Sequence, residues 1–362
     1  MAKNKFKDEF ALQRPDIAPD FDTVNSYVRG RKVLVTGAGG SIGSELCRQL
    51  IDCELESLLL LGRGENSIFE IHRELLERES RIELETIIAD VRDRPRMERV
   101  FREYIPQVVF HTAAHKHVHL MERHPDEAVK NNVIGTANIA QIALATGVET
   151  FVLISSDKAI NPTNVYGATK KIAEYIVRDL AEDGATKFVV VRFGNVIRSR
   201  GSIIPIFERQ IRNGGPITIT HPEMERFFMS IPEAAYLVLQ SAGIAESGQI
   251  CVLDMGNSIR IVELANWLIK EAGLEPGKDI QIAFTGIRPG EKIVEELVHA
   301  ENKLECTPWE KIMLDQTDGV DSSNLHEELD QLTHNIDRYE RGEIIKCLQR
   351  IVPTYVPLTD KV

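Results

Sequence analysis

The chain has 362 residues, of which 43% are hydrophobic and 27% are charged, and its formal net charge is −12. Because a typical domain has about 150 residues, this length predicts two lobes, or one large α/β domain with a smaller cap. The composition is that of a globular protein and excludes a disordered or collagen-like chain, while the acidic balance disfavours nucleic-acid binding.

The sequence gives few indications of membrane targeting, secretion or disulfide bonding. No stretch approaches the roughly 18 apolar residues of a membrane span, and the opening MAKNKFKDEF is too charged for a secretory signal. We therefore predict a cytoplasmic protein without a membrane span. The five cysteines form no CxxC pair, which predicts buried free thiols rather than disulfides or a Cys-rich zinc site.

After a polar lead-in over residues 1–30, short aliphatic runs alternate with stretches of helical period. The predicted strands are 32–37, 55–61, 84–90, 107–114, 150–156 and 187–193. The predicted helices are 41–52, 65–79, 93–104, 126–147 and 165–184. This alternation predicts an α/β fold with βαβ units around a doubly wound parallel sheet.

The pattern changes in the second half of the chain. Segments punctuated by Pro and Gly, such as NGGPITITHPEMERFFM, predict a smaller irregular lobe over 196–320. The tail, 321–362, is charged and has helical patterns around LHEELDQL and GEIIKCLQRIV. The sequence does not indicate what this tail packs against.

A glycine-rich loop joins the first strand to the first helix. Glycines let the backbone turn sharply and approach a pyrophosphate, which then lies at the helix N-terminus. A tight turn without a ligand is the simpler interpretation, but the position at the start of a βαβ run favours a dinucleotide. The predicted cofactor-binding residues of the loop are Gly37, Gly39, Gly40, Ser41, Ile42 and Gly43.

The end of the second strand bears on the choice of cofactor. NAD-preferring sites place a carboxylate there for the ribose hydroxyls, whereas this chain has Gly-Arg63-Gly. A guanidinium suits a 2′-phosphate, so NADP is favoured over NAD. In the alternative, Arg63 is a solvated turn residue and Glu65 binds the ribose. Asp90 and Val91, after the third strand, are candidates for the adenine, although Asp90 could instead cap the next helix.

Five histidines lie in the segment His111 to His124. We predict no metal site there, because alternate residues point to opposite faces and no HExxH motif is present. The loop after the fourth strand of a dinucleotide fold lies beside the nicotinamide. Lys116 is therefore predicted to contact cofactor and substrate.

The fifth strand ends in Ser156-Asp157-Lys158, and a helix then opens with Tyr166 and Lys170. Residues four apart share a helical face. A neighbouring ammonium and a positive nicotinamide lower the pKa of a phenol, so Tyr166 is a candidate general base on an alcohol. The simpler interpretations are a surface pair for Tyr166 and Lys170 and a salt link for Asp157 and Lys158.

Seven ordered motifs carry a resemblance over residues 31–300: AAHKHVHLME, SSDKA, NPTNVYGATK, RFGNV, SRGSIIPIF, RFFM and RPGEK. Together they resemble the nucleotide-sugar 4,6-dehydratases of the extended short-chain dehydrogenase/reductase superfamily. These enzymes of bacterial polysaccharide and flagellin glycosylation typically act on UDP-N-acetylglucosamine. The resemblance implies a Rossmann-type domain over 31–195 with returning later segments, and a UDP-sugar-binding lobe mainly over 196–320.

The same resemblance implies residue roles. Tyr166 would deprotonate the 4-hydroxyl, Lys158 would remove the C5 proton and Asp157 would protonate the departing C6 oxygen. Ser156 would bind the 4-hydroxyl, and Lys170 would hold the nicotinamide ribose. Further substrate-binding candidates are Asn195, Arg200, Arg288 and Glu291. The simpler interpretation of each arginine is a charged surface residue. Arg226 is the least certain candidate for substrate binding.

Several alternatives stay open. A C4 or C5 epimerase would share the fold and Tyr166 but would not need Asp157 and Lys158. A non-catalytic NADP sensor would need neither this pair nor the pair of Tyr166 and Lys170. Tyr166 favours inversion at C5, whereas the lead-in resembles the segment after the membrane helices of large relatives, so the C5 outcome is undecided. Relatives form dimers or hexamers, and 126–147 with 165–184 could supply a homo-oligomer interface.

Overall fold

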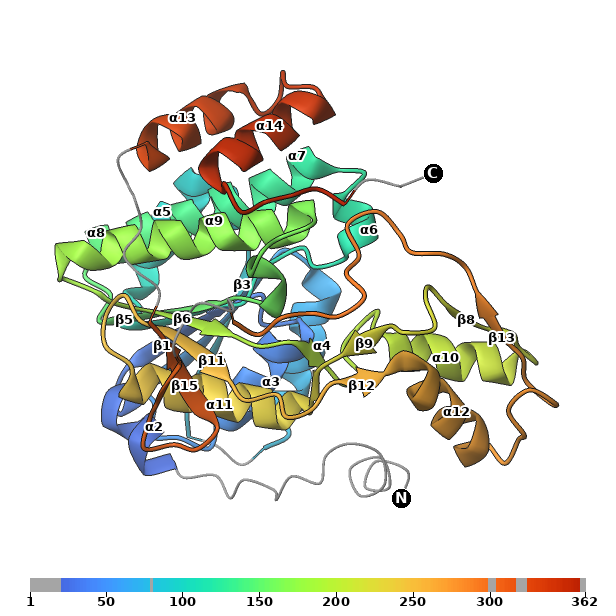
Figure 1. Ribbon diagram of the computed structural model, residues 1–362. Coiled ribbons are helices and arrows are strands. Elements are labelled where there is room, and N and C mark those ends of the chain that lie inside the picture. Colours follow the sequence, from blue (N-terminus) through green and yellow to red (C-terminus); the bar gives the residue numbers. More distant parts are fainter. Residues whose placement is uncertain (1–20, 79–80, 299–303, 317–323, 359–362) are drawn as a thin grey trace.

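The computed structural model describes residues 21–78, 81–298, 304–316 and 324–358 (Figure 1). The first 20 residues of the predicted lead-in lie outside the described residues. Its last part forms α2 (Phe21–Val28), which buries Val24 and Val28. This helix adds to the sheet domain, a feature that the polar lead-in did not suggest.

A nine-stranded sheet forms the centre of the molecule, in the order β14-β15-β11-β6-β5-β4-β1-β2-β3. The strands are β1 (Lys32–Thr36), β2 (Ser57–Gly62), β3 (Glu83–Ile88), β4 (Val108–His111), β5 (Thr150–Ile154), β6 (Lys187–Arg192), β11 (Ile250–Leu253), β14 (Leu304–Cys306) and β15 (Ile312–Asp315). Pairing is parallel from β3 to β11 and antiparallel at β15 and β14. All six predicted strands are confirmed.

Helices cover both faces of this sheet. One layer contains α2, α3 (Ser41–Leu50), α4 (Glu65–Leu76) and α11 (Ile231–Ile244). The opposite layer contains α5 (Arg94–Tyr104), α8 (Gly135–Ala145) and α9 (Val165–Leu180). Within β1, Val33 and Val35 pack in the first layer and Leu34 in the second, as strand alternation requires. The predicted doubly wound α/β fold is confirmed.

The predicted helix 126–147 is divided into three parts. These are α7 (Pro125–Ala128), the π-helical turn η2 (Val129–Ile134) and α8. The wider turn places Asn132 against the segment after β4, where its side chain accepts from the His115 amide at 2.8 Å and donates to the His115 carbonyl at 3.0 Å. Two shorter turns, α6 (Val118–Met121) and η3 (Asp157–Ala159), follow β4 and β5.

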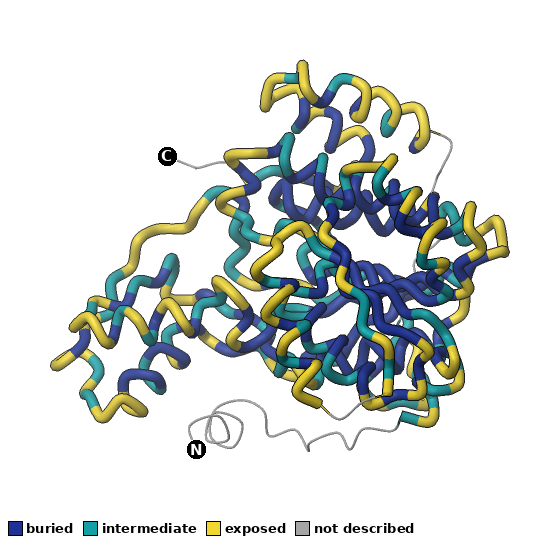
Figure 2. The backbone as a smooth tube through the Cα atoms, turned by 180° about the vertical axis from the view of Figure 1, so that it is seen from behind, coloured by how far each residue is buried: buried dark blue, intermediate teal, exposed yellow. Residues whose placement is uncertain are grey.

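A smaller lobe extends away from the sheet and has its own core (Figure 2). It contains α10 (Ile203–Arg212), α12 (Ile261–Glu271) and the short strands β7 (Asn195–Val196), β8 (Ile217–Ile219), β9 (Glu225–Arg226), β10 (Phe228–Met229), β12 (Ile259–Arg260) and β13 (Ile282–Phe284). From the same stretch of sequence, α11, β11 and β15 return to the sheet domain. The chain therefore crosses between the two bodies several times.

The tail forms α13 (Leu325–Asn335) and α14 (Arg341–Ile351), which lie over α7 and α9 (Figure 1). Leu348, Cys347 and Ile351 are buried there in one cluster with Ile172 and Ile176 of α9. The tail thus covers part of the helical face that the sequence suggested for an oligomer interface.

The cysteines differ in part from the expectation. All five are free thiols, but Cys306 on the edge strand β14 is exposed, whereas the other four are buried. Separately, within the described ranges no helix has both the length and the apolar character needed to cross a membrane.

Candidate active site

The glycine-rich loop between β1 and α3 is packed so closely that its glycines have no room for side chains. Gly37 has a φ of +69°, and a Cβ there would lie 2.8 Å from Thr112 Oγ1. A Cβ on Gly39 would lie 2.5 Å from Ser67 Oγ, and one on Gly43 would clash with the Gly37 carbonyl. The loop therefore needs glycines for its own packing, and it brings bare backbone to the N-terminus of α3, as a pyrophosphate requires.

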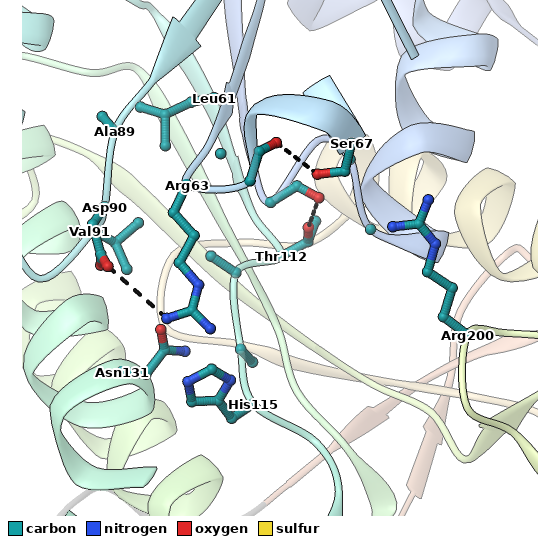
Figure 3. A pocket seen from close by; sticks show the side chains of 17 residues that line it. Leu61, Arg63, Ser67, Ala89, Asp90, Val91, Thr112, His115, Asn131 and Arg200 are labelled. Carbon is teal, nitrogen blue, oxygen red and sulfur yellow. Dashed lines mark hydrogen bonds and ion pairs between the residues drawn. The ribbon is translucent and has the colours of Figure 1, made fainter. Parts of the chain in front are cut away.

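A pocket opens beside this loop at the ends of β2 and β3 (Figure 3). Arg63, Asp90 and Val91 line it, together with His115 and Asn131, whereas Glu65 does not. Arg63 Nη1 lies 4.0 Å from Asp90 Oδ2. The pocket thus presents a guanidinium and a carboxylate where the sequence predicted the adenosine end of a dinucleotide, and its glycine cradle fits such a group.

Arg92 is a residue of this region that the sequence analysis did not single out. Its guanidinium donates to Asp90 Oδ2 at 2.7 Å and lies 3.0 Å from Glu127 Oε2 on α7. Burial acts to raise the pKa of Asp90, but the hydrogen bonds from Arg92 outweigh it and lower the pKa. Asp90 is therefore ionised at neutral pH and accepts hydrogen bonds.

A second, larger pocket continues from the loop towards the lobe. It shares Gly40, Thr112 and His115 with the first pocket, so the two are joined. The predicted site residues that line it are Ser41, Ile42, Gly43, Lys116, Ser156, Lys158, Tyr166, Lys170, Asn195, Arg200, Arg288 and Glu291. The fold thus gathers these residues from β1 through the lobe around one space.

The start of α9 positions Tyr166 and Lys170. Asn164 caps the helix by accepting from the Gly167 amide at 2.7 Å, and the Val165 amide donates to Glu122 at 2.6 Å. The Tyr166 and Lys170 side chains are both almost wholly buried. Burial lowers the pKa of Lys170 to about 8, with Glu174 opposing the change.

The surroundings of Tyr166 differ from the expectation in one respect. Burial raises the pKa of the phenol, and a hydrogen bond with Ser156 and the charge of Lys158 oppose this rise. Lys158 is therefore a cation that acts on Tyr166, a role for which the sequence analysis considered Lys170.

Asp157 and Lys158 form a buried pair at the end of β5. Lys158 Nζ lies 3.1 Å from Asp157 Oδ1 and 3.4 Å from Asn195 Oδ1. Ser156 Oγ donates to the same Asp157 oxygen at 2.8 Å. The other oxygen, Asp157 Oδ2, is buried without a hydrogen-bond partner among the described residues. Burial raises the pKa of Asp157, although the Lys158 charge acts against the rise.

Glu295 is a third member of this cluster, and the sequence analysis missed it. Its Oε1 lies 3.3 Å from Lys158 Nζ, and the residue is only 4% exposed. The stretch GEKIVEE continues the RPGEK motif, but two adjacent glutamates in a polar segment look like solvated residues. Only the tertiary burial separates Glu295 from its exposed neighbour Glu296.

Arg226 explains how Glu295 is held. Its guanidinium donates to the carbonyls of Ile293 at 2.9 Å and Lys292 at 2.8 Å, and its Nε lies 3.8 Å from Glu295 Oε1. Because these carbonyls belong to the segment that carries Glu295, Arg226 fixes that segment against β9. Arg226 thus supports the Glu295 segment and also lines the larger pocket.

The remaining candidates lie at the rim of the larger pocket. Lys116 Nζ donates to Ser199 Oγ at 3.1 Å, and burial with the Lys158 charge lowers its pKa. Arg200 lies over the phosphate loop, where its amide donates to Ser41 Oγ at 3.0 Å and its guanidinium to Glu70 at 2.9 Å. Arg200 also lines the first pocket (Figure 3), so the structure places it nearer the dinucleotide loop than the sequence suggested.

The histidine segment is divided between packing at His111 and the lining of the larger pocket by His115, His117 and His119. His111 is buried, and its ring nitrogens lie 2.8 Å from Thr36 Oγ1 and 3.1 Å from Thr136 Oγ1. Burial lowers its pKa to about 3, so the ring is neutral. In the part of the chain that the structure describes, no group of three His, Cys, Asp or Glu residues could hold a metal ion.

Comparisons with known proteins agree with this arrangement. Residues 33–317 match the family model described as polysaccharide biosynthesis protein. The probable polysaccharide biosynthesis protein EpsC of Bacillus subtilis is 54% identical over 301 residues, which cover 82% of this chain and 50% of that protein. The chain therefore spans about half the length of this curated relative.

Two further similarities concern a smaller enzyme and a solved structure. An inverting UDP-N-acetylglucosamine 4,6-dehydratase of Campylobacter jejuni is 32% identical over 278 residues, covering 75% of this chain and 79% of that one. The X-ray structure of Pen from Bacillus thuringiensis has a TM-score of 0.73 and 33% identity, and the match covers 80% of this chain and 90% of that chain. The Rossmann-type fold expected from the sequence is confirmed.

Proposed function

Because the chain belongs to the family of polysaccharide biosynthesis proteins, we propose that it dehydrates UDP-N-acetylglucosamine to a UDP-4-keto-6-deoxy-N-acetylhexosamine with a recycled NADP. The observation that carries this proposal is that Tyr166 and Lys158 line one pocket that continues from the glycine loop, while Asp157 is buried in contact with Lys158, with Nζ 3.1 Å from its Oδ1. A phenol, a carboxyl group and an amine are the groups that oxidation followed by elimination requires.

The residues of the chain divide the proton transfers among them. A bound nicotinamide would take the C4 hydride and later deliver it to C6. Tyr166 accepts the proton of the 4-hydroxyl, Lys158 takes the C5 proton, and Asp157 gives its proton to the C6 oxygen, which leaves as water. C5 then recovers one proton, so the net change is the loss of one water.

The burial of Asp157 supports its role as the acid. Burial raises the pKa of Asp157 and so favours the neutral carboxyl group that a proton donor to the departing oxygen requires. Ser156 contacts both Asp157 and Tyr166 and so lies between the acid and the base. We propose that Ser156 also orients the 4-hydroxyl between them.

The binding roles follow from chemistry and position. We propose that Arg288, Asn195 and Glu291 bind the uridine diphosphate at the lobe side of the larger pocket, since guanidinium groups grip phosphates in pairs of hydrogen bonds. We propose that Arg200 and Lys116 contact substrate or cofactor where the two pockets meet. Arg63 would meet a 2′-phosphate, with Asp90 beside the adenine.

Product analysis by NMR tests this function. The purified chain with NADP and UDP-N-acetylglucosamine should give a new C6 methyl doublet. In deuterated water, the coupling of the product protons also reports whether C5 is retained or inverted. A galacto-configured product without a methyl group would show that the chain catalyses C4 epimerisation instead of dehydration. C4 epimerisation does not require the Asp157 and Lys158 pair.

A further inference from the structure

The buried cluster around Lys158 contains a carboxylate, Glu295, to which the proposed reaction assigns no role. Two carboxylates, Asp157 at 3.1 Å and Glu295 at 3.3 Å, contact the same Nζ atom. Each also has one oxygen buried without a hydrogen-bond partner among the described residues. Two buried carboxylates that share one ammonium are costly unless a further cation or a proton compensates them. Arg226 Nε lies 3.8 Å from Glu295 Oε1, whereas burial favours a proton on Asp157.

This arrangement conflicts with a simple role for Lys158 as a base. Burial alone disfavours the ammonium, but the carboxylates of Asp157 and Glu295 outweigh it and raise the pKa of Lys158. A protonated amine has no lone pair with which to take the C5 proton. The amine must first lose its proton to a group that it contacts.

Glu295 is the available acceptor for that proton. Asp157 must itself be protonated to act as the acid, and burial favours this form. Although burial opposes it, the charges of Lys158 and Arg226 lower the pKa of Glu295 and keep it ionised. Glu295 does not line the pocket, and of the two pocket residues near its carboxylate, Lys158 and Arg226, the amine of Lys158 is the group that exchanges a proton with it.

We propose that Glu295 is a positioning residue that stores the proton of Lys158 during each turnover and then returns it through Lys158 to Asp157. This inference rests on the proposed dehydration and adds to it a named proton store outside the substrate pocket. The geometry that carries it is the continuous line from Ser156 through Asp157 and Lys158 to Glu295.

The protons balance around this line. Lys158 first gives a proton to Glu295, and its free amine takes the C5 proton as Asp157 protonates the leaving C6 oxygen. Lys158 then passes a proton to Asp157 and takes one from Glu295, which restores the starting state. When C5 is reprotonated by Lys158, the cluster recovers that proton from Tyr166 through Ser156.

Other charged groups around Lys158 and Glu295 set the pH dependence of proton transfer between these two residues. The titratable and charged side chains that act on Lys158 or Glu295 are Asp157, Tyr166, Arg226, Lys292 and Lys116. Of these, the cations Arg226 and Lys292 favour an ionised Glu295. Glu295 is therefore charged at rest and is neutral from the moment Lys158 gives it a proton until Lys158 takes that proton back.

The test compares Glu295→Gln with the matched control Glu296→Gln, its exposed neighbour. With UDP-N-acetylglucosamine in deuterated water, reduced nicotinamide in a single turnover reports C4 oxidation, and deuterium at C5 with methyl formation reports elimination. We expect Glu295→Gln to keep C4 oxidation but to lose elimination about 100-fold, a typical contribution of a positioned proton acceptor. Glu296→Gln should stay within about twofold.

A pH series separates this role from a structural one. In Glu295→Gln, elimination should recover as the pH rises, because Lys158 can then lose its proton to solvent, and Glu295→Asp should recover part of the rate at neutral pH. Elimination that stays within about twofold in Glu295→Gln would overturn the proposal. So would an equal loss of oxidation and elimination without recovery at high pH.

A substrate-free arm keeps this inference distinct from the proposed function. The rate at which a small acylating reagent modifies Lys158, followed by peptide mass spectrometry over a pH series, reports the titration of the amine. Glu295→Gln should shift it to lower pH, whereas Glu296→Gln should not. An unchanged titration would overturn the role of Glu295, and a wild-type chain that forms no methyl product would instead overturn the proposed dehydration.

Discussion

Arg63 is the side chain that we propose sets the choice between NADP and NAD. It lines the pocket beside the glycine loop, and its guanidinium is half exposed and lies 4.0 Å from Asp90. Asp90 is already bound closely by Arg92. Arg63 is therefore positioned to meet a further anion, such as the 2′-phosphate of NADP, without leaving the carboxylate unpaired.

We expect Arg63→Ala to weaken NADP binding about 10-fold or more, because a hydrogen bond to a charged group contributes about 1.5 to 3 kcal/mol. NAD binding should change little, since NAD has no 2′-phosphate. Calorimetric titration with both cofactors measures the two affinities. An equal loss for NAD and NADP would show that Arg63 supports the loop rather than the phosphate.

At the scale of elements, a buried ionic network joins α9 to the sheet. Arg192 on β6 donates to Glu174 of α9 at 2.6 Å and to Asp315 of β15 at 2.5 Å. Ser155 donates to Glu174 at 2.6 Å. Because α9 carries Tyr166 and Lys170, this network fixes the helix that positions the proposed base.

Glu174→Gln should lower the free energy of unfolding by about 3 to 5 kcal/mol, because it leaves the buried guanidinium of Arg192 without one of its two carboxylate partners. Exposed Glu182→Gln serves as the control, and urea denaturation measures both. Burial would raise the pKa of Glu174, but Arg192 and Lys171 lower it from 4.5 to about 2. A carboxylate with a lowered pKa stabilises the fold above its unfolded pKa.

The pH dependence of this variant follows from that sign. The stability difference between the wild type and Glu174→Gln should be full above pH 4.5 and should shrink as the pH falls towards about 2. Denaturation curves at several pH values measure the difference. A constant difference over this range would contradict the assigned pKa.

The six strands and the glycine-dependent turn after β1 could be predicted from local patterns, because the hydrophobic period and the spacing of glycines are sequence properties. The clustering of Asp157 with Lys158 was also visible, since the two are adjacent. Glu295 could not be found in this way, because it reaches Lys158 across 137 residues through the fixing contacts of Arg226. The π-helical turn at Val129–Ile134 was read as ordinary helix, since its apolar period barely differs.

At the scale of the whole molecule, the tail completes the helical layer. Leu348 on α14 is fully buried in the cluster that includes Ile172 and Ile176 of α9. The sequence showed the period of α13 and α14, but it held no local signal for what they pack against. The contact is tertiary and joins the last helix to the layer that carries the proposed base.

Leu348→Asp should detach this tail, because a buried carboxylate without a partner costs several kcal/mol. The exposed apolar face of α9 should then promote association of the chain and proteolysis between the sheet domain and α13. Gln349→Asp, on the exposed side of the same helix, is the control. Light scattering and limited proteolysis check both variants, and identical behaviour of the two would contradict the packing described.

The central claim is that one pocket oxidises C4, eliminates water across C5 and C6, and returns the same hydride to C6. UDP-N-acetylglucosamine labelled with deuterium at C4 tests it most directly, with product NMR as the readout. The account predicts a monodeuterated C6 methyl group in a 4-keto product. Deuterium found at C4 of an epimerised sugar, or lost from a product without a methyl group, would contradict it.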